Sequence, residues 1–141
     1  MEKISFAAFM ADRTKNFEPV EFVVSSRFSD GGNPVPFKIH PITQEENEAI
    51  VQECMVNYMD PVTRERRQKL DSDRYTAELI ARCTSYPDMN DAALQDSYKA
   101  VGAVDLVRKM LLPGEFRRLA DAIYEVCGFK GVSDELNAAK N

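Results

Sequence analysis

The spacing of apolar residues changes once along the chain, and this change most constrains the fold. Between residues 20 and 41 apolar and polar positions alternate, with Phe22, Val24 and Phe28 on one side of the first run and Phe37 and Ile39 on one side of the second. A period of two is typical of half-buried strands. The sequence Ser-Asp-Gly-Gly-Asn-Pro at 29–34 lies between the runs, and glycine and asparagine tolerate positive φ. We therefore predict an N-terminal β-hairpin over residues 20–41.

Two prolines lie in the second half of this predicted hairpin. Pro34 and Pro36 have no amide hydrogen to donate to a neighbouring strand. Prolines are confined to edge strands or to bulges for this reason. We therefore expect the second strand to lie at the edge of its sheet.

From residue 43 onward the apolar spacing is that of helices. Thr43 and Glu46 form a capping-box pattern, in which each side chain bonds the other residue's amide. Helical spacing predicts that this helix continues to Tyr58 and ends at Asp60-Pro61. Its apolar stripe consists of Ile50, Val51, Cys54, Met55 and Tyr58. The segment 60–73 is predicted to be the least structured part of the interior.

Four more helical stretches follow. One residue among Asp71, Ser72 and Asp73 is expected to cap a helix that stops near Tyr86-Pro87, and Asn90-Asp91 is expected to cap the next. Gly102 marks a break before an apolar stripe at Ala103, Leu106, Val107, Met110 and Leu111. The final long helix should begin at Pro113, with Glu115 at its positive end, and terminate at Gly128. We expect Phe116 and Ile123 to be buried on it.

The ends of the chain carry weaker patterns. Residues 5–12 could form a short helix with Phe6, Phe9 and Met10 on one side, and residues 15–19 have the composition of a linker. A last short helix could start at Ser133 and lead into a loose tail. The predicted fold is α+β: a predominantly helical single domain over residues 1–141, with the hairpin at about 20–41, a helical body at about 43–128 and a loose C-terminal tail.

Composition excludes several classes of function. The chain has 18 basic and 23 acidic residues, a net charge of −5, whereas a nucleic-acid binder needs a basic surface to neutralise phosphates. No apolar run approaches the roughly 20 residues that span a bilayer. The start of the chain lacks the features of a signal peptide, so we expect a cytoplasmic protein that binds neither nucleic acid nor membrane.

No constellation of residues indicates catalysis, a cofactor or a metal. His40, the one histidine, shares a strand face with Lys38 and is expected to point to solvent. Three cysteines without a C-x-x-C pattern indicate buried reduced thiols. The Asp30-Gly31-Gly32-Asn33 stretch lacks the Gly-Lys-Ser/Thr of a phosphate loop, and the acidic residues of 71–91 lack calcium-loop spacing, so turns and helix caps explain both. We predict no catalytic, cofactor-binding or metal-binding residues, and partner-binding residues remain unknown.

A basic cluster lies in the predicted loop. It consists of Arg64, Arg66, Arg67 and Lys69, interrupted by Glu65 and Asp71. One interpretation is a solvated loop balanced by the nearby acidic residues. The other is a docking patch for an acidic or helical partner.

Five separated blocks, in order and at matching spacing, resemble the XkdN-like tail assembly chaperones of PBSX-type prophages. They are Phe22–Ser25 with Pro34–Ile39 and Pro41–Glu48, then Tyr75–Ala81, Pro87–Tyr98, Met110–Phe116 and Cys127–Phe129. The resemblance covers nearly the whole chain, except that 64–69 look particular to this sequence. It carries no residue-level binding motif.

This resemblance implies a non-catalytic role in building phage tails. Such chaperones are thought to bind the helical tape-measure protein and keep it soluble until tail-tube protein polymerises around it, and to be absent from the mature virion. A frameshifted longer form and a homo-oligomer are both conceivable. The alternatives are a structural component of the tail or baseplate and a host adaptor module. A third alternative is an enzyme, against which stands the lack of any clustered acid, base or nucleophile.

Overall fold

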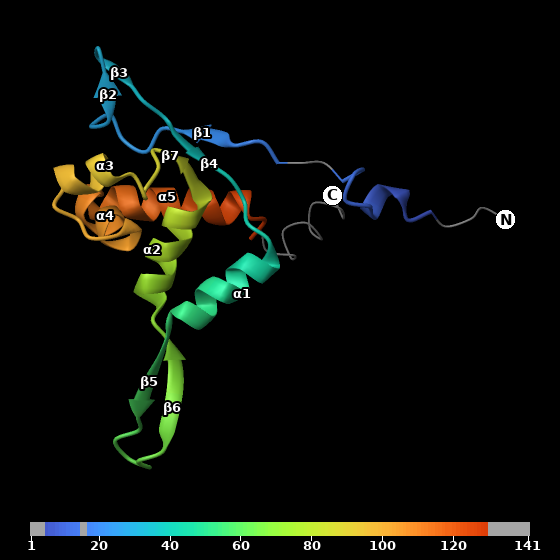
Figure 1. Cartoon of the computed structure of the whole chain (residues 1–141), viewed down its shortest axis with the longest axis vertical. Coiled ribbons are helices and arrows are strands. Elements are labelled where there is room, and N and C mark those ends of the chain that lie inside the picture. Colours follow the sequence, from blue (N-terminus) through green and yellow to red (C-terminus); the bar gives the residue numbers. More distant parts are fainter. Residues whose placement is uncertain (1–4, 15–16, 130–141) are drawn as a thin grey trace, which may run out of the picture.

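The computed structural model describes residues 5–14 and 17–129, and within these ranges it contains five α-helices, seven short strands and one 3₁₀ turn (Figure 1). In chain order the elements are η1 (Ala7–Phe9), β1 (Val20–Phe22), β2 (Ser29–Asp30), β3 (Asn33–Pro34), β4 (Phe37–Ile39), α1 (Gln44–Glu53), β5 (Met55–Met59), β6 (Arg66–Leu70), α2 (Ser72–Cys83), β7 (Thr84–Tyr86), α3 (Ala92–Ser97), α4 (Ala103–Met110) and α5 (Pro113–Val126). The predicted helix after Ser133 and the C-terminal tail lie outside the described residues.

The inner faces of α2, α4 and α5 form the centre of the core. Their apolar residues recur every three or four positions, so each helix buries one stripe. The least exposed large aliphatic side chains are Leu79, Ile80, Leu106, Val107, Leu119 and Ile123, each at most 1% exposed. The prediction for Ile123 is confirmed, whereas Phe116 is only half-buried against this cluster.

Most predicted helix ends are confirmed. Thr43 and Glu46 form the capping box of α1, and Asp71 and Asp91 accept hydrogen bonds from amides in the first turns of α2 and α3. Pro113 opens α5. Gly128, with φ of 88°, follows its end and donates its amide to Glu125 O at 3.0 Å. These signals act within one turn of helix, so they could be read without knowledge of the fold.

One sheet lies against the helices, with strand order β1-β4-β7 and antiparallel pairing throughout. In β4, Phe37 and Ile39 point into the core and Lys38 points out, as the alternation predicted. The expected edge position is wrong, because β4 is the central strand. Pro34 and Pro36 precede the β4 ladder of Phe37–Ile39 and therefore interrupt none of its hydrogen bonds.

The continuous N-terminal hairpin is also wrong. Val20 pairs with Ile39 at the base, and Ser29 pairs with Pro34 in a separate two-stranded sheet near the tip. Between them the chain turns at Ser25, whose hydroxyl accepts the amide of Arg27 at 3.1 Å. This side-chain bond competes with a strand ladder and divides the predicted hairpin into two short pairings.

A second hairpin occupies the segment predicted as the end of a helix and a loop. Helix α1 stops at Glu53, and β5 pairs with β6 from Met55↔Leu70 to Met59↔Arg66. Asp60 forms the turn by accepting the amides of Val62 and Thr63 at 2.8 and 3.1 Å. Asp60-Pro61 therefore marks a strand turn and not the end of a helix.

The predominantly helical fold class is therefore wrong. The structure is 43% helical and 19% strand, with three small sheets and five helices among the described residues, which makes it a mixed α and β fold. Three strands were not predicted: β6 lies in the segment predicted to be unstructured, whereas β5 and β7 were assigned to helices. Met55–Met59 also fits helical spacing, and Thr84–Tyr86 directly continues the helical run of α2.

Two arginines hold the N-terminal segment, residues 17–27, against α5. Arg27 forms a two-pronged ion pair with Glu115, at 2.8 Å from Nε and 2.6 Å from Nη2, and also donates to Met110 O. Arg118 donates to Val23 O at 3.0 Å and lies over the Phe22 ring. These bonds fix the segment along the helix and so position one wall of the groove described next.

Glu115 is almost wholly buried, with 8% of its side chain exposed. The Arg27 guanidinium and the amide of Leu112, which donates to Glu115 Oε1 at 2.8 Å, hold its pKa down at about 2. The sequence predicted only a favourable interaction of Glu115 with the helix end. Its partner Arg27 lies 88 positions away, and only the tertiary structure brings the two together.

Candidate functional site: a groove along the C-terminal half of α5

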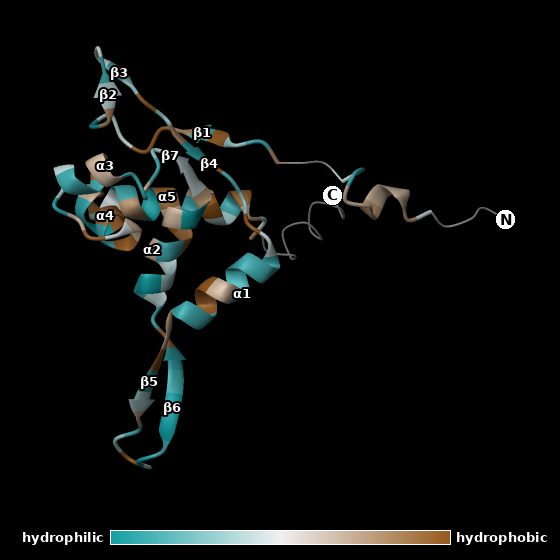
Figure 2. Cartoon of the chain, in the orientation of Figure 1, coloured by the Kyte–Doolittle hydropathy of each residue, from teal (hydrophilic) through white to brown (hydrophobic). Residues whose placement is uncertain are grey.

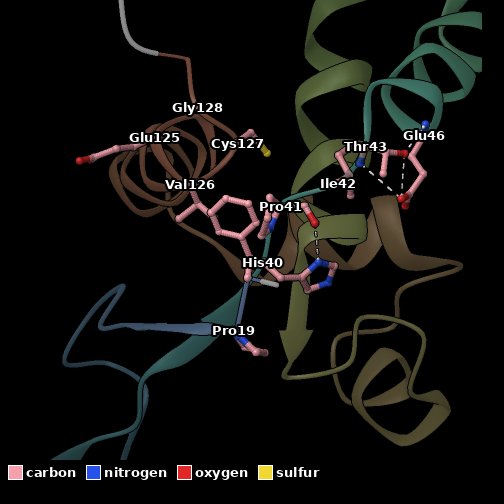
Figure 3. Close-up of a pocket in the computed structure, with 11 residues that line it drawn as sticks. Pro19, His40, Pro41, Ile42, Thr43, Glu46, Glu125, Val126, Cys127 and Gly128 are labelled. Atoms are coloured by element: carbon pink, nitrogen blue, oxygen red, sulfur yellow. Dashed lines mark hydrogen bonds between the residues drawn. The ribbon is translucent and has the colours of Figure 1, made fainter. Parts of the chain in front are cut away.

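Two adjoining cavities form an open groove beside the C-terminal half of α5. The larger, of about 710 Å³, extends from the N-terminal segment to the start of α1 (Figure 3). The smaller, of about 450 Å³, continues along β1. Phe17, Glu125 and Val126 line both, so the two form one continuous surface.

Three segments build the groove. The N-terminal segment contributes Phe17, Pro19, Val20 and Phe22, and the last turns of α5 contribute Ala122, Glu125, Val126, Cys127 and Gly128. The connection from β4 into α1 contributes His40, Pro41, Ile42, Thr43 and Glu46. Arg118 holds the first segment on α5, and the Thr43 capping box fixes the third (Figure 3).

The groove is mainly apolar and is acidic at two points of its rim. Phe17 is 74% exposed and Val20 is 48% exposed, which is unusual for large apolar side chains close together. Glu46 and Glu125 are exposed carboxylates on opposite walls. Such a surface can accommodate an apolar stripe whose flanks carry positive charge.

His40 lines the larger cavity and is half-buried, so the expectation that it points freely into solvent is wrong. Its amide donates to Cys83 O at 2.8 Å. Its ring Nδ1 lies 3.0 Å from Pro41 O (Figure 3). The ring nitrogen is thereby occupied by the backbone of the next residue. His40 serves here as part of the groove wall.

The prediction of buried thiols is confirmed for Cys54 and Cys83 but not for Cys127. Cys54 and Cys83 are buried and Cys127 is half-buried beside the groove. Burial, together with the neighbouring Cys127, raises the pKa of the Cys83 thiol. Within residues 5–14 and 17–129, no group of three or more His, Cys, Asp and Glu side chains could hold a metal ion.

The other candidate residues from the sequence lie elsewhere. Asp30, Gly31, Gly32 and Asn33 form the tight β2–β3 turn, with both glycines at positive φ. Asp71 and Asp91 are helix caps. Arg66, Arg67 and Lys69 lie on β6, and Arg64 lies in the turn before it.

The groove itself was missed by sequence reasoning. Phe17 lies in a segment predicted as a linker, where an aromatic residue without periodic partners was the available signal. The other walls come from residues 40–46 and 125–128, which lie 23 to 29 and 108 to 111 positions from Phe17 along the chain. No local pattern reports a surface assembled in this way.

Comparison with known proteins agrees with this fold over nearly the whole chain. A family model described as phage XkdN-like tail assembly chaperone protein matches residues 6–140. In Bacillus subtilis (strain 168), the phage-like element PBSX protein XkdN is 31% identical over 136 residues, which are 94% of this chain and 91% of XkdN. The uncharacterized protein YqbN of the same organism is 33% identical with the same coverage.

The crystal structure of the protein YqbN superposes with a TM-score of 0.73 at 29% identity, covering 92% of this chain and 99% of that one. None of the helices in the described part of the chain is long and apolar enough to cross a membrane. Since the family model and both relatives extend over most of its length, the chain belongs to the XkdN-like family of phage tail assembly chaperones.

Proposed function

We propose that this protein binds the tape-measure protein of its phage in the host cytoplasm and keeps it soluble until tail-tube protein assembles around it. It does so by binding, without catalysis, and leaves before the virion matures. The observation that carries this proposal is the apolar groove along α5 with acidic residues on its rim.

The chemistry of the groove suits a helical client. A long helix that awaits its tube exposes apolar stripes, and these aggregate in water unless they are covered. An amphipathic helix can place such a stripe against Phe17, Val20 and Val126, as helices do in the grooves of other binding proteins. Basic residues beside the stripe would then face Glu46 and Glu125.

Co-expression with the tape-measure protein from the same gene cluster tests the proposal. We expect the client to become soluble and to co-purify with the chain. Phe17→Asp places a charge in the groove and should weaken binding at least ~10-fold, as the loss of a central aromatic contact does at other interfaces. Val101→Asp is the matched control, because Val101 is 88% exposed and lies outside the groove.

Thermal unfolding of both variants separates loss of binding from loss of folding. Equal binding by the wild type and Phe17→Asp would remove the groove from the proposal. A client that stays insoluble and unbound beside the wild type would remove the chaperone function. Presence of the chain in purified phage particles would instead favour a structural role in the tail or baseplate.

A further inference from the structure

The β5–β6 hairpin extends away from the rest of the molecule (Figure 1). We call residues 55–70 the arm. Every residue of β6 is exposed, and β5 is exposed from Asn57 to Met59. An isolated two-stranded hairpin is only marginally stable in water and gains stability when it packs against a helix or a further strand. The arm is therefore a surface that a partner would stabilise.

The arm has the opposite charge to the rest of the chain. It carries four basic side chains, Arg64, Arg66, Arg67 and Lys69, against Asp60 and Glu65, which gives a net charge of +2. The whole chain has a net charge of −5, so the residues outside the arm carry −7. Figure 2 shows most of β6 as hydrophilic. Its best electrostatic match is therefore an acidic surface such as the chain itself provides.

Helix α1 is the most acidic element outside the arm. It carries Glu45, Glu46, Glu48 and Glu53 and no basic residue. Ile50 is buried against the body, whereas Glu45, Glu48 and Gln52 are exposed. Helical spacing places these three on one outward face. This face is both acidic and helical.

The arm cannot reach the α1 of its own chain. The two elements meet at Cys54, between Glu53 and Met55, and leave it in different directions (Figure 1). Arg66 pairs with Met59 at the far end of the arm, and Glu45 lies at the far end of the helix. Contact between the two surfaces therefore requires two molecules.

We propose that the arm of one copy docks on the outward face of α1 in a second copy. Met59 and Leu70 lie on the same face of the hairpin as Arg66, and they are 59% and 38% exposed. Among the described residues Arg66 makes no ion pair, whereas Arg67 is engaged by Asp60 and Glu65 at 3.6 and 3.5 Å. Arg66 is thus available to Glu45 and Glu48 of the neighbour.

Because the arm and α1 are different surfaces, each copy offers both halves of the contact. Two copies can exchange arms in a closed dimer, or the contact can repeat head-to-tail and generate a ring if the rotation closes, or a filament if it does not. This interface is separate from the groove along α5, so the proposal does not depend on the client.

Charge reversal on each surface gives a direct test by sedimentation velocity. Arm reversal is Arg64→Glu with Arg66→Glu, and helix reversal is Glu45→Lys with Glu48→Lys. The wild-type chain should associate more strongly as concentration rises and less strongly as salt screens the charges. Each reversed protein by itself should lose at least ~10-fold in self-association, because like charges then meet. Arg117→Glu, an exposed reversal on α5, is the matched control and should associate like the wild type.

Mixing the two reversed proteins is the decisive measurement. The mixture pairs a basic arm with an acidic outward face of α1, and an acidic arm with an outward face of α1 made basic at positions 45 and 48, so association should return. Circular dichroism confirms that each variant is folded. A monomeric wild type, an arm reversal without effect, or a mixture that stays monomeric would each overturn the proposal.

Discussion

Met110 and Met59 are the same residue type in two very different regions. Met110 is 4% exposed in α4, within the helical core, and Met59 is 59% exposed near the end of the β5–β6 arm. In the core, each helix buries an apolar stripe that can be predicted from the spacing of its own apolar residues. In the arm, backbone hydrogen bonds fix the strand pairing without a core beneath. The comparison teaches that the secondary structure of a buried segment can be predicted from its apolar spacing. An exposed hairpin has no such constraint, and its sequence can fit a helical pattern.

The largest effect is expected in the core. Ile123→Ala removes a fully buried side chain from the C-terminal half of α5 and should cost about 2–5 kcal/mol of unfolding free energy, from lost transfer energy and the cavity left behind. Urea denaturation measures it. Phe116→Ala on the same helix should cost less than the Ile123 variant, because Phe116 is only half-buried. The reverse order would mean that the core has been misplaced.

An intermediate effect is expected where the N-terminal segment is tied to the core. Glu115→Gln removes a buried charged acceptor from Arg27 and should cost about 1.5–3 kcal/mol. The pKa of Glu115 is about 2 in the folded protein, below its ordinary 4.5, so its ion pair stabilises the fold above pH 4.5. That contribution is lost as the pH falls from 4.5 towards 2.

Urea denaturation midpoints of the wild type and Glu115→Gln across this pH range test the predicted direction of the pH dependence. The difference between the two midpoints should become smaller as the pH falls. A constant gap would show that the carboxylate charge of Glu115 contributes nothing to its role.

The smallest effect is expected in the arm. Met59→Ala removes a side chain that buries little, so the free energy of unfolding of a dilute sample should change by less than about 0.5 kcal/mol. Met110→Ala is the matched control and should cost about 2–5 kcal/mol. A large loss of unfolding free energy in Met59→Ala would mean that the arm is part of the core. The contrast between an exposed arm and a buried core would then be wrong.

Most of the groove could not be predicted from the sequence, because its walls come from distant parts of the chain. Thr43 and Glu46 could be paired from the sequence because a capping box spans only four consecutive residues. Phe17 and Val126 meet across the groove from positions more than 100 residues apart. Their proximity depends on the Arg27–Glu115 and Arg118 contacts, which place the N-terminal segment along α5.

By itself the sequence determined the buried helix stripes, their caps and the alternation of Phe37 and Ile39 in β4, because each depends on residues one or two turns apart. Only the tertiary structure decided that β4 is central, that α1 gives way to a strand after Glu53, and that a groove forms beside α5. Strand partners and pocket walls are chosen by contacts between distant segments, and a local pattern that fits both helix and strand cannot choose between them.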